Sequence, residues 1–221
     1  MPIQETIRNI PFFSNLNEEQ VDLVASISNL INHPKDSILY YESDVTRNLT
    51  FLVKGLIKIY KVDKYDNEIF LYHIYKNSMI SELTSLNDDE IYCFSNAEFM
   101  DDSIVLSIDF EKFQELFLSK NILTMDLMEI LLAKTHQLQC IVNRELVFDA
   151  TAKVAFMLNQ DIDMFNKLKR QEVSFMLHIQ PETLSRVLKR LVRNETIKIE
   201  SGNVKIINKE QLVSVFKGVG L

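Results

Sequence analysis

The sequence of 221 residues has few cysteines and glycines, with two and four respectively, and no tryptophan. Cys93 and Cys140 are far apart and neither belongs to a C-x-x-C pair, which excludes a disulfide framework and a four-cysteine metal or iron–sulfur site within one chain. No run of about 18 apolar residues is present, so we expect no membrane-spanning helix. The start, MPIQETIRNIPFF, has no secretory signal pattern. We therefore expect a cytoplasmic protein with reduced thiols and no membrane partner.

Motifs of common enzyme classes are also missing. The sequence has no Gly-rich phosphate loop, no H-E-x-x-H and no nucleophile elbow. We therefore expect a protein that is not an enzyme.

Charge is distributed unevenly, although the whole chain carries a net charge of −7. Residues 1–150 hold 12 Lys and Arg against 24 Asp and Glu, a balance of −12, whereas residues 151–221 hold 12 against 7, a balance of +5. Such an asymmetry indicates that the C-terminal segment meets a polyanion while the rest of the chain does not.

The N-terminal half changes from helical to strand-like patterning. Asn17 is a good N-cap for a short helix whose apolar residues include Val21 and Val24. From about Ile31 to Asp109, short apolar runs such as "LTFLVKG" and "EIFLYHIY" alternate with polar turn clusters. This pattern predicts a β-sandwich or barrel.

A long helical stretch is expected from about 111 to 147, with a break near 119–121. One set of apolar residues in it alternates by four and three, as in a short coiled-coil seam, which predicts self-association into a homodimer. The alternative is a helix that packs only on its own β-domain. Met128, Leu132 and Val142 lie off the seam and are expected to make that packing. The expected seam consists of Leu127, Leu131, Lys134, Leu138 and Ile141.

The last 73 residues, 149–221, have the pattern of a winged helix. Asp149 is a good N-cap for a new helix, and Pro181 suits the first position of another, because its missing N–H costs nothing there. The helix "KRQEVSFMLH" precedes that proline after a tight turn, which makes a helix-turn-helix. "TIKIESGNVKII" then reads as a hairpin around Ser201-Gly202-Asn203, and Asn208 begins a closing helix.

The second helix of this pair, "PETLSRVLKRLVRN", has one apolar and one charged face. Its apolar residues are Leu184, Val187, Leu188, Leu191 and Val192. The opposite face suits a DNA groove: Arg can donate to guanine O6 and N7, Glu can accept from cytosine N4, and Ser can do either. A solvated surface face is the alternative. The charged face holds Glu182, Ser185, Arg186, Lys189 and Arg193.

Several motifs resemble a known family. "IPFFSNLNEEQVDLVA" is similar to its opening helix, "FLVKGLIKIYKVD" to its strand-glycine-strand signature with Gly55 at the glycine, and "SEL" at 81–83 to its Gly-Glu-Leu. "PETLSRVLKRL" resembles its recognition helix. The family comprises the bacterial transcription regulators named after the cyclic-AMP receptor protein and the fumarate–nitrate reduction regulator, here called Crp/Fnr.

The resemblance implies an α+β fold with a cyclic-nucleotide-binding-like β-barrel of jelly-roll type (1–110), a dimerisation helix and hinge (111–148), and a winged helix-turn-helix (149–221). It also implies a homodimer that binds TTGA-like palindromic half-sites in double-stranded DNA, and contacts RNA polymerase if it is an activator. Glu182 is expected to hold Arg186 in place as well. His178 replaces a frequent glycine of the turn. The implied DNA contacts are Gln180, Glu182, Thr183, Ser185, Arg186, Lys189 and Arg193.

The effector of the β-domain stays open. The cyclic-AMP branch holds a phosphate with an Arg-Ser pair, but residues 80–109 contain no Lys or Arg, so we do not expect cyclic AMP to bind. Some relatives bind haem, and His73 or His136 could ligate iron, although an ordinary histidine is the alternative for each. Cys93 is either a thiol sensor or a small buried residue. The pocket candidates are Ser81, Glu82, Leu83, Cys93 and Phe94.

A second function class competes with DNA binding. In this alternative, the chain is a ligand-binding signalling module whose winged helix makes protein contacts only. The basic balance of residues 151–221 and the Glu182, Ser185 and Arg186 stripe favour DNA.

Overall fold

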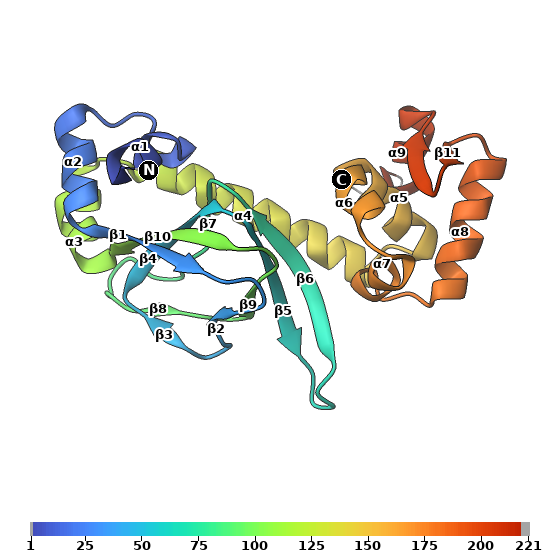
Figure 1. The fold of residues 1–221 in the computed structure, drawn as a ribbon, viewed down its shortest axis with the longest axis horizontal. Coiled ribbons are helices and arrows are strands. Elements are labelled where there is room, and N and C mark those ends of the chain that lie inside the picture. Colours follow the sequence, from blue (N-terminus) through green and yellow to red (C-terminus); the bar gives the residue numbers. More distant parts are fainter. Residues whose placement is uncertain (1, 218–221) are drawn as a thin grey trace. The chain divides into compact units, whose positions relative to one another are not determined.

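The computed structural model describes residues 2–217, and the chain in it divides into two compact units, residues up to Lys134 and residues from Thr135 (Figure 1). Among the described residues, no helix is both long and apolar enough to cross a membrane.

The first unit begins with three short helices, α1 (Ile3–Arg8), the 3₁₀ helix η1 (Pro11–Phe13) and α2 (Glu18–Ser26). As predicted, Asn17 caps α2: its side chain accepts from the Gln20 N–H at 2.9 Å, and the Gln20 side chain accepts from the Asn17 N–H at 2.9 Å. Both bonds satisfy amides that the first helical turn leaves free.

A β-domain follows, built from two four-stranded antiparallel sheets in the orders β1-β10-β4-β7 and β2-β9-β5-β6, and a small β3-β8 pair. The predicted β-sandwich or barrel is confirmed. The strands are β1 (Ser28–His33), β2 (Ile38–Tyr40), β3 (Val45–Thr46), β4 (Asn48–Lys54), β5 (Leu56–Val62), β6 (Glu68–Tyr75), β7 (Ser78–Met79), β8 (Ile91–Tyr92), β9 (Asn96–Phe99) and β10 (Ser103–Asp109).

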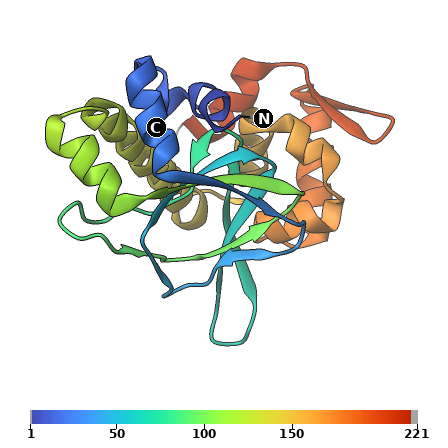
Figure 2. The same cartoon turned by 60° about the vertical axis from the view of Figure 1, so that its left-hand side comes forward.

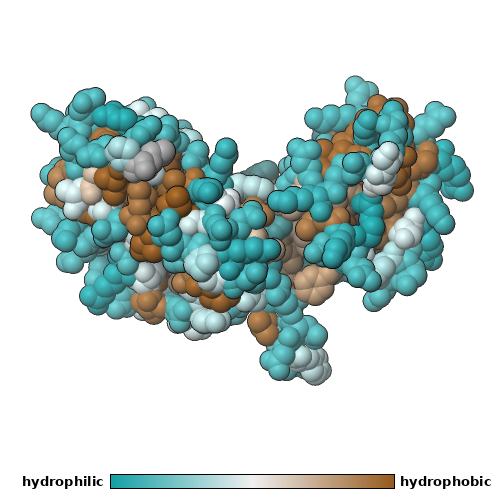
Figure 3. All heavy atoms as spheres, in the orientation of Figure 1, coloured by the Kyte–Doolittle hydropathy of each residue, from teal (hydrophilic) through white to brown (hydrophobic). Residues whose placement is uncertain are grey.

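The β5–β6 hairpin projects from the body of this domain (Figures 1 and 2). Its tip is mostly hydrophilic (Figure 3) and is closed by Asp63, whose carboxylate accepts from the Tyr65 and Asn67 N–H groups at 2.8 and 2.9 Å. A carboxylate that bonds its own backbone two residues on is a common way to close such a turn.

Gly55 joins β4 to β5 with a φ of +106°, a backbone conformation that side chains with a Cβ rarely adopt. A Cβ at this position would also collide with the side chain of Ser103 on β10. Both the torsion and the close approach of two strands therefore require glycine here.

The core of the first unit joins the helices to one sheet. Phe12, Phe13 and Phe51 lie with ring centroids 4.8 to 5.2 Å apart, and Phe12 also approaches Phe113 of α3 (Phe110–Leu116). Leu127 belongs to the same cluster. Burial of these large aromatic surfaces is the main source of the free energy that fixes the helices on the β-domain.

The long helical stretch is interrupted, as predicted. After α3 comes the 3₁₀ helix η2 (Leu118–Lys120), and α4 (Thr124–Leu146) begins only after Asn121 and Leu123 adopt positive φ values of 58° and 63°. A residue in the left-handed region ends a helix, and asparagine tolerates it well.

The second unit is the predicted winged helix, with a short α6 that the sequence pattern did not indicate. Asp149 caps α5, accepting from the Ala152 N–H at 2.8 Å, and Asn208 caps α9, accepting from the Gln211 N–H at 2.9 Å. The expected domain extends to residue 221, but 218–221 lie outside the described residues. Its elements are α5 (Ala150–Gln160), α6 (Ile162–Lys167), α7 (Arg170–Met176), α8 (Pro181–Arg193), β11 (Ile197–Glu200), β12 (Asn203–Ile206) and α9 (Lys209–Lys217).

The core of this unit buries one face of α8. Leu184, Val187, Leu188 and Leu191 are all at most 5% exposed. Val192, which the sequence analysis placed on the same face, is 38% exposed. It lies at the edge of the apolar stripe, where helical spacing alone does not separate buried from exposed positions.

Candidate DNA interface and effector pocket

The turn between α7 and α8 is tight and uses His178 in the left-handed region, with a φ of 51°. The N–H of His178 donates to the Phe175 carbonyl at 3.0 Å, and the N–H of Ile179 donates to Ser174 at 3.1 Å. Both bonds satisfy carbonyls at the end of α7. A histidine therefore serves where the resemblance implies a glycine, as the sequence analysis expected.

Glu145 at the end of α4 holds this turn. Its carboxylate lies 2.8 Å from His178 Nδ1 and 3.1 Å from Lys153 Nζ, and its other oxygen accepts from Arg144 Nε at 2.6 Å. Burial alone would raise the pKa of Glu145, but the hydrogen bonds from His178, Arg144 and Lys153 lower it to about 2. Local sequence patterns do not indicate this contact, because Lys153 and His178 follow Glu145 by 8 and 33 residues in the chain.

The outer face of α8 is exposed as predicted, and with it most of the expected DNA contacts. Arg186 Nη2 donates to Thr183 Oγ1 at 3.1 Å. Thr183 stands three residues before Arg186, on the same face of the helix, so it can orient the guanidinium. The role predicted for Glu182 in holding Arg186 stays a prediction. The exposed residues are Gln180, Glu182, Ser185, Arg186, Lys189 and Arg193, with Thr183 half-buried.

Further cations that the sequence analysis missed lie on the same unit. Arg190 is exposed on α8, one turn after Arg186. Lys198 and Lys205 on the β11–β12 wing each lie 2.7 Å from the carboxylate of Glu200. Hydrogen bonds from these two lysines lower the pKa of Glu200 to about 2. Arg190 could have been identified from the sequence, because it follows Arg186 by four residues on a helix. The two wing lysines could be recognised as neighbours only from the register of the hairpin, which pairs Lys198 with Lys205.

The N-terminal half of α4 uses for its own core the apolar face that was predicted for the dimer. Leu127 is 2% exposed and Leu131 packs partly buried on the same core of the first unit, so these expected interface residues serve their own domain. Lys134 Nζ is 3.5 Å from the Ile80 carbonyl. Leu138 is 56% exposed and Ile141 half-buried. The exposed apolar side chains on the other face are Met125, Met128, Leu132, Val142 and Leu146.

The reason for this difference is physical. Both faces repeat at intervals of three and four, and periodicity alone cannot tell which of them meets the chain's own core. Lys134 in the first face could have indicated that this face meets the chain's own domain. A lone buried cation is tolerated better where it can reach a backbone carbonyl, as Lys134 does.

The β-domain contains a small cavity of about 60 Å³. Ser81, Glu82 and Cys93 line it as predicted, whereas Leu83 packs on the core and Phe94 is 49% exposed. Two candidates are therefore corrected: Leu83 and Phe94 do not belong to the lining of this cavity. Its full lining is Leu39, Tyr40, Thr46, Thr50, Ser81, Glu82, Ile91 and Cys93.

Glu82 is held by neutral donors beside this cavity. Its carboxylate accepts from the Phe94 N–H at 2.7 Å, from Ser95 Oγ at 2.9 Å and from the Tyr72 hydroxyl at 3.4 Å. Ser81 is fixed separately, since its hydroxyl accepts from the Thr50 N–H at 2.9 Å.

The thiol of Cys93 is 4% exposed, and burial, followed by the charges of Glu82 and Asp44, raises its pKa to about 11. A thiol in such surroundings stays protonated and unreactive at neutral pH. Cys93 therefore acts as a small buried residue in the cavity wall.

The two histidines considered for haem lie in different surroundings. His73 on β6 packs beside Phe70, with ring centroids 4.8 Å apart, and near Tyr75 at 6.2 Å. His136 on α4 has its Nδ1 3.9 Å from the Sγ of Cys140. Among the described residues, no group of three or more His, Cys, Asp and Glu is arranged to hold a metal ion.

Comparisons with known proteins match both units. The chain matches the cyclic nucleotide-binding domain over residues 30–120 and the Crp-like helix-turn-helix domain over residues 154–215. It is 20% identical over 204 residues to the cyclic AMP receptor protein of Thermus thermophilus, which covers 90% of this chain and 94% of that protein.

Solved structures share the fold. CooA from Carboxydothermus hydrogenoformans, in a variant form, has a TM-score of 0.71 at 18% identity and covers 93% of this chain and 94% of its own. FixK2 from Bradyrhizobium japonicum has a TM-score of 0.64 at 15% identity and covers 86% of this chain and 97% of its own.

Proposed function

Because the chain belongs to the Crp/Fnr family of transcription regulators, we propose that it is a homodimer that reads palindromic DNA with α8. The main support for this proposal is the set of side chains on the outer face of α8. It presents Glu182, Ser185 and Arg186 next to the exposed cations Lys189 and Arg193, opposite a face whose four leucine and valine side chains Leu184, Val187, Leu188 and Leu191 are buried.

These side chains divide into two kinds of DNA contact. Arg186 is the guanine reader, because a guanidinium can donate to O6 and N7 at once, and Glu182 can accept from a cytosine N4. Ser185 can bond either base. Lys189 and Arg193 lie further along the helix and suit phosphates, which fix the register of the helix without reading sequence. The Glu-x-x-Ser-Arg spacing resembles that of the fumarate–nitrate branch of the family, and this resemblance implies TTGA-like half-sites.

The exposed face of α4 supports the homodimer. Met125, Met128 and Leu132 repeat at intervals of three and four, and Val142 and Leu146 continue the same stripe. In a parallel pair of such helices, a stripe of this period packs against its own copy. A homodimer would carry two copies of α8, which suits two half-sites about 10 base pairs apart.

The first experiment asks whether the protein binds duplex DNA at all. We expect the wild type to bind a labelled duplex in an anisotropy titration, with an affinity that falls steeply as salt rises, because each neutralised phosphate releases counterions. The slope of log affinity against log salt should correspond to several phosphates. Failure to bind duplex DNA even at low salt would indicate that the winged helix contacts protein instead.

Cyclic AMP is not expected to be the effector. The cavity of about 60 Å³ is far smaller than the roughly 300 Å³ or more that ligand pockets usually offer. Residues 80–109 supply no Lys or Arg to a phosphate, and donors near the cavity already bond Glu82. Calorimetry of the wild type should therefore detect no binding of cyclic AMP. Binding in the micromolar range would contradict this part of the proposal.

A further inference from the structure

The Glu82 carboxylate occupies an arrangement of donors that has the chemistry of an anion site. An amide N–H and two hydroxyls, from Phe94, Ser95 and Tyr72, converge on its two oxygens at 2.7, 2.9 and 3.4 Å. Ser95 is only 2% exposed, so its hydroxyl is desolvated and needs a partner. Backbone N–H groups and hydroxyls that converge on one anion bind it through charge-assisted hydrogen bonds.

The two sides of this site come from separate parts of the chain. Tyr72 belongs to β6, and Phe94 and Ser95 lie in the turn between β8 and β9. Glu82 is 12 and 13 residues before those two donors. The carboxylate therefore crosslinks the two segments, as a bound ligand would.

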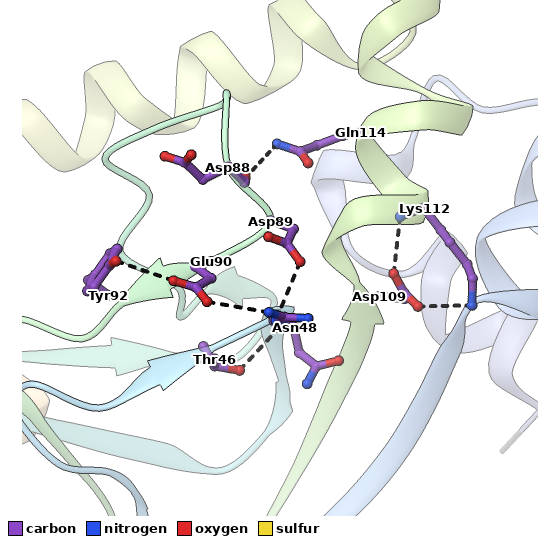
Figure 4. A network of polar contacts seen from close by, with 10 residues as sticks. Thr46, Asn48, Asp88, Asp89, Glu90, Tyr92, Asp109, Lys112 and Gln114 are labelled. Atoms are coloured by element: carbon purple, nitrogen blue, oxygen red, sulfur yellow. Dashed lines mark hydrogen bonds and ion pairs between the residues drawn. The ribbon is translucent and has the colours of Figure 1, made fainter.

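The loop that leads to Phe94 is anchored, so the donors are preorganised. Gln114 Nε2 of α3 donates to the Asp88 carbonyl at 3.1 Å (Figure 4). Arg47 approaches Glu90 at 3.4 Å. These contacts hold the approach to the turn from α3 and from the residue that joins β3 to β4, independently of Glu82. Removal of the Glu82 side chain should therefore leave the donors in place.

Glu82 also acts on α4. Burial lowers the pKa of Lys134 to about 8, and the negative charge of Glu82 opposes that effect. The Lys134 ammonium is 3.5 Å from the carbonyl of Ile80, two residues before Glu82. The anion site and α4 are thus electrostatically linked within the first unit.

We infer that Glu82 is a built-in anionic ligand: its carboxylate fills, from within the chain, a site that accepts a small monocarboxylate once the side chain is removed. The occupied site joins β6 to the β8–β9 turn without any dissolved effector. The matching external ligand is of the size of formate or acetate, because the vacated space is that of one carboxylate beside a cavity of about 60 Å³. This inference concerns the β-domain and does not depend on DNA binding.

Chemical rescue tests the inference. We expect Glu82→Ala to lower the midpoint of thermal unfolding by roughly 4–10 °C, the effect of losing hydrogen bonds to a charged group in a chain of this size. Sodium formate should restore part of that loss with a saturable dependence, whereas sodium chloride at equal ionic strength should not. The wild type should show no such response, since its site is full.

Glu98→Ala is the matched control. It also removes a half-buried carboxylate of the β-domain, but the partner of Glu98 is the ammonium of Lys58 at 2.7 Å, which keeps Glu68 at 2.8 Å. Formate should not rescue this variant. An equal formate effect on Glu82→Ala, Glu98→Ala and the wild type, or no effect of formate on Glu82→Ala, would overturn the inference.

A double-mutant cycle covers the case in which Glu82→Ala does not fold. Ser95→Ala should lower the unfolding midpoint of the wild type, because a donor to the carboxylate is lost. The same change in a Glu82→Gln background should cost less, since the amide is a weaker acceptor than the carboxylate. Equal shifts in both backgrounds would also overturn the inference.

Discussion

The double variant Leu132→Asp/Val142→Asp is expected to convert the proposed homodimer to a monomer. Both side chains are exposed, at 64% and 53%, on the same apolar face of α4. In a symmetric pair of helices the double variant would place four carboxylates in one apolar seam, where each would lose its hydration without gaining a cation. Sedimentation at micromolar concentration should therefore show a monomer.

The loss of the dimer should also reduce DNA affinity. Each α8 would bind its half-site independently, so affinity for a palindrome should fall by about 100-fold or more, as expected when a linked second contact is lost. Single half-sites should be bound about as weakly by the variant as by the wild type. The two readouts separate assembly from the chemistry of base recognition.

Two control variants make the dimer prediction specific to one face. Ala133→Asp adds the same charge at an exposed position on the far side of α4 and should leave the dimer intact. Leu138→Asp tests the face that sequence periodicity favoured. A monomer produced by Leu138→Asp alone, together with a dimeric Leu132→Asp/Val142→Asp variant, would assign the interface to the original face instead.

Replacement of Arg186 by alanine is expected to weaken binding to the cognate site by about 1–3 kcal/mol and to abolish the preference for guanine at one position of each half-site. The reason is that a bidentate donor to guanine O6 and N7 is lost. Thr183, which accepts from Arg186 at 3.1 Å, helps to orient the guanidinium, so Thr183→Val should show a smaller loss of the same kind.

Lys189→Ala is the matched comparison on the same helix. It removes an exposed cation of the phosphate-contacting kind. Binding should weaken about equally for all sequences, and the slope of log affinity against log salt should fall by about one unit. Equal loss of base discrimination in both variants would contradict the assignment of Arg186 as the base reader.

Most elements of the winged helix, α6 excepted, could be predicted because their signals are local. Two N-caps, Asp149 and Asn208, accept hydrogen bonds from the first turn of their helices, and Pro181 suits the first position of α8. A few neighbouring residues are therefore enough to predict where each of these helices begins. The break before α4 was predictable for the same reason, since Asn121 tolerates the left-handed conformation.

The parts that could not be predicted depend on long-range packing. Leu127 and Leu132 differ little as sequence signals, but only Leu127 meets the core around Phe113. Glu82 similarly resembles any acidic residue of its segment until the fold brings Ser95 and Tyr72 to it. Periodicity identifies an apolar face or a polar residue, whereas its partner is set by the tertiary structure.

Selection of binding sites from random duplex DNA by the wild-type protein tests in one measurement whether α8 reads DNA. We expect enrichment of an inverted repeat with TTGA-like half-sites centred about 10 base pairs apart, and loss of one guanine preference in each half when Arg186→Ala is selected in parallel. The absence of any enriched repeat, or an unchanged motif with full discrimination in Arg186→Ala, would contradict the claim that the outer face of α8 reads DNA.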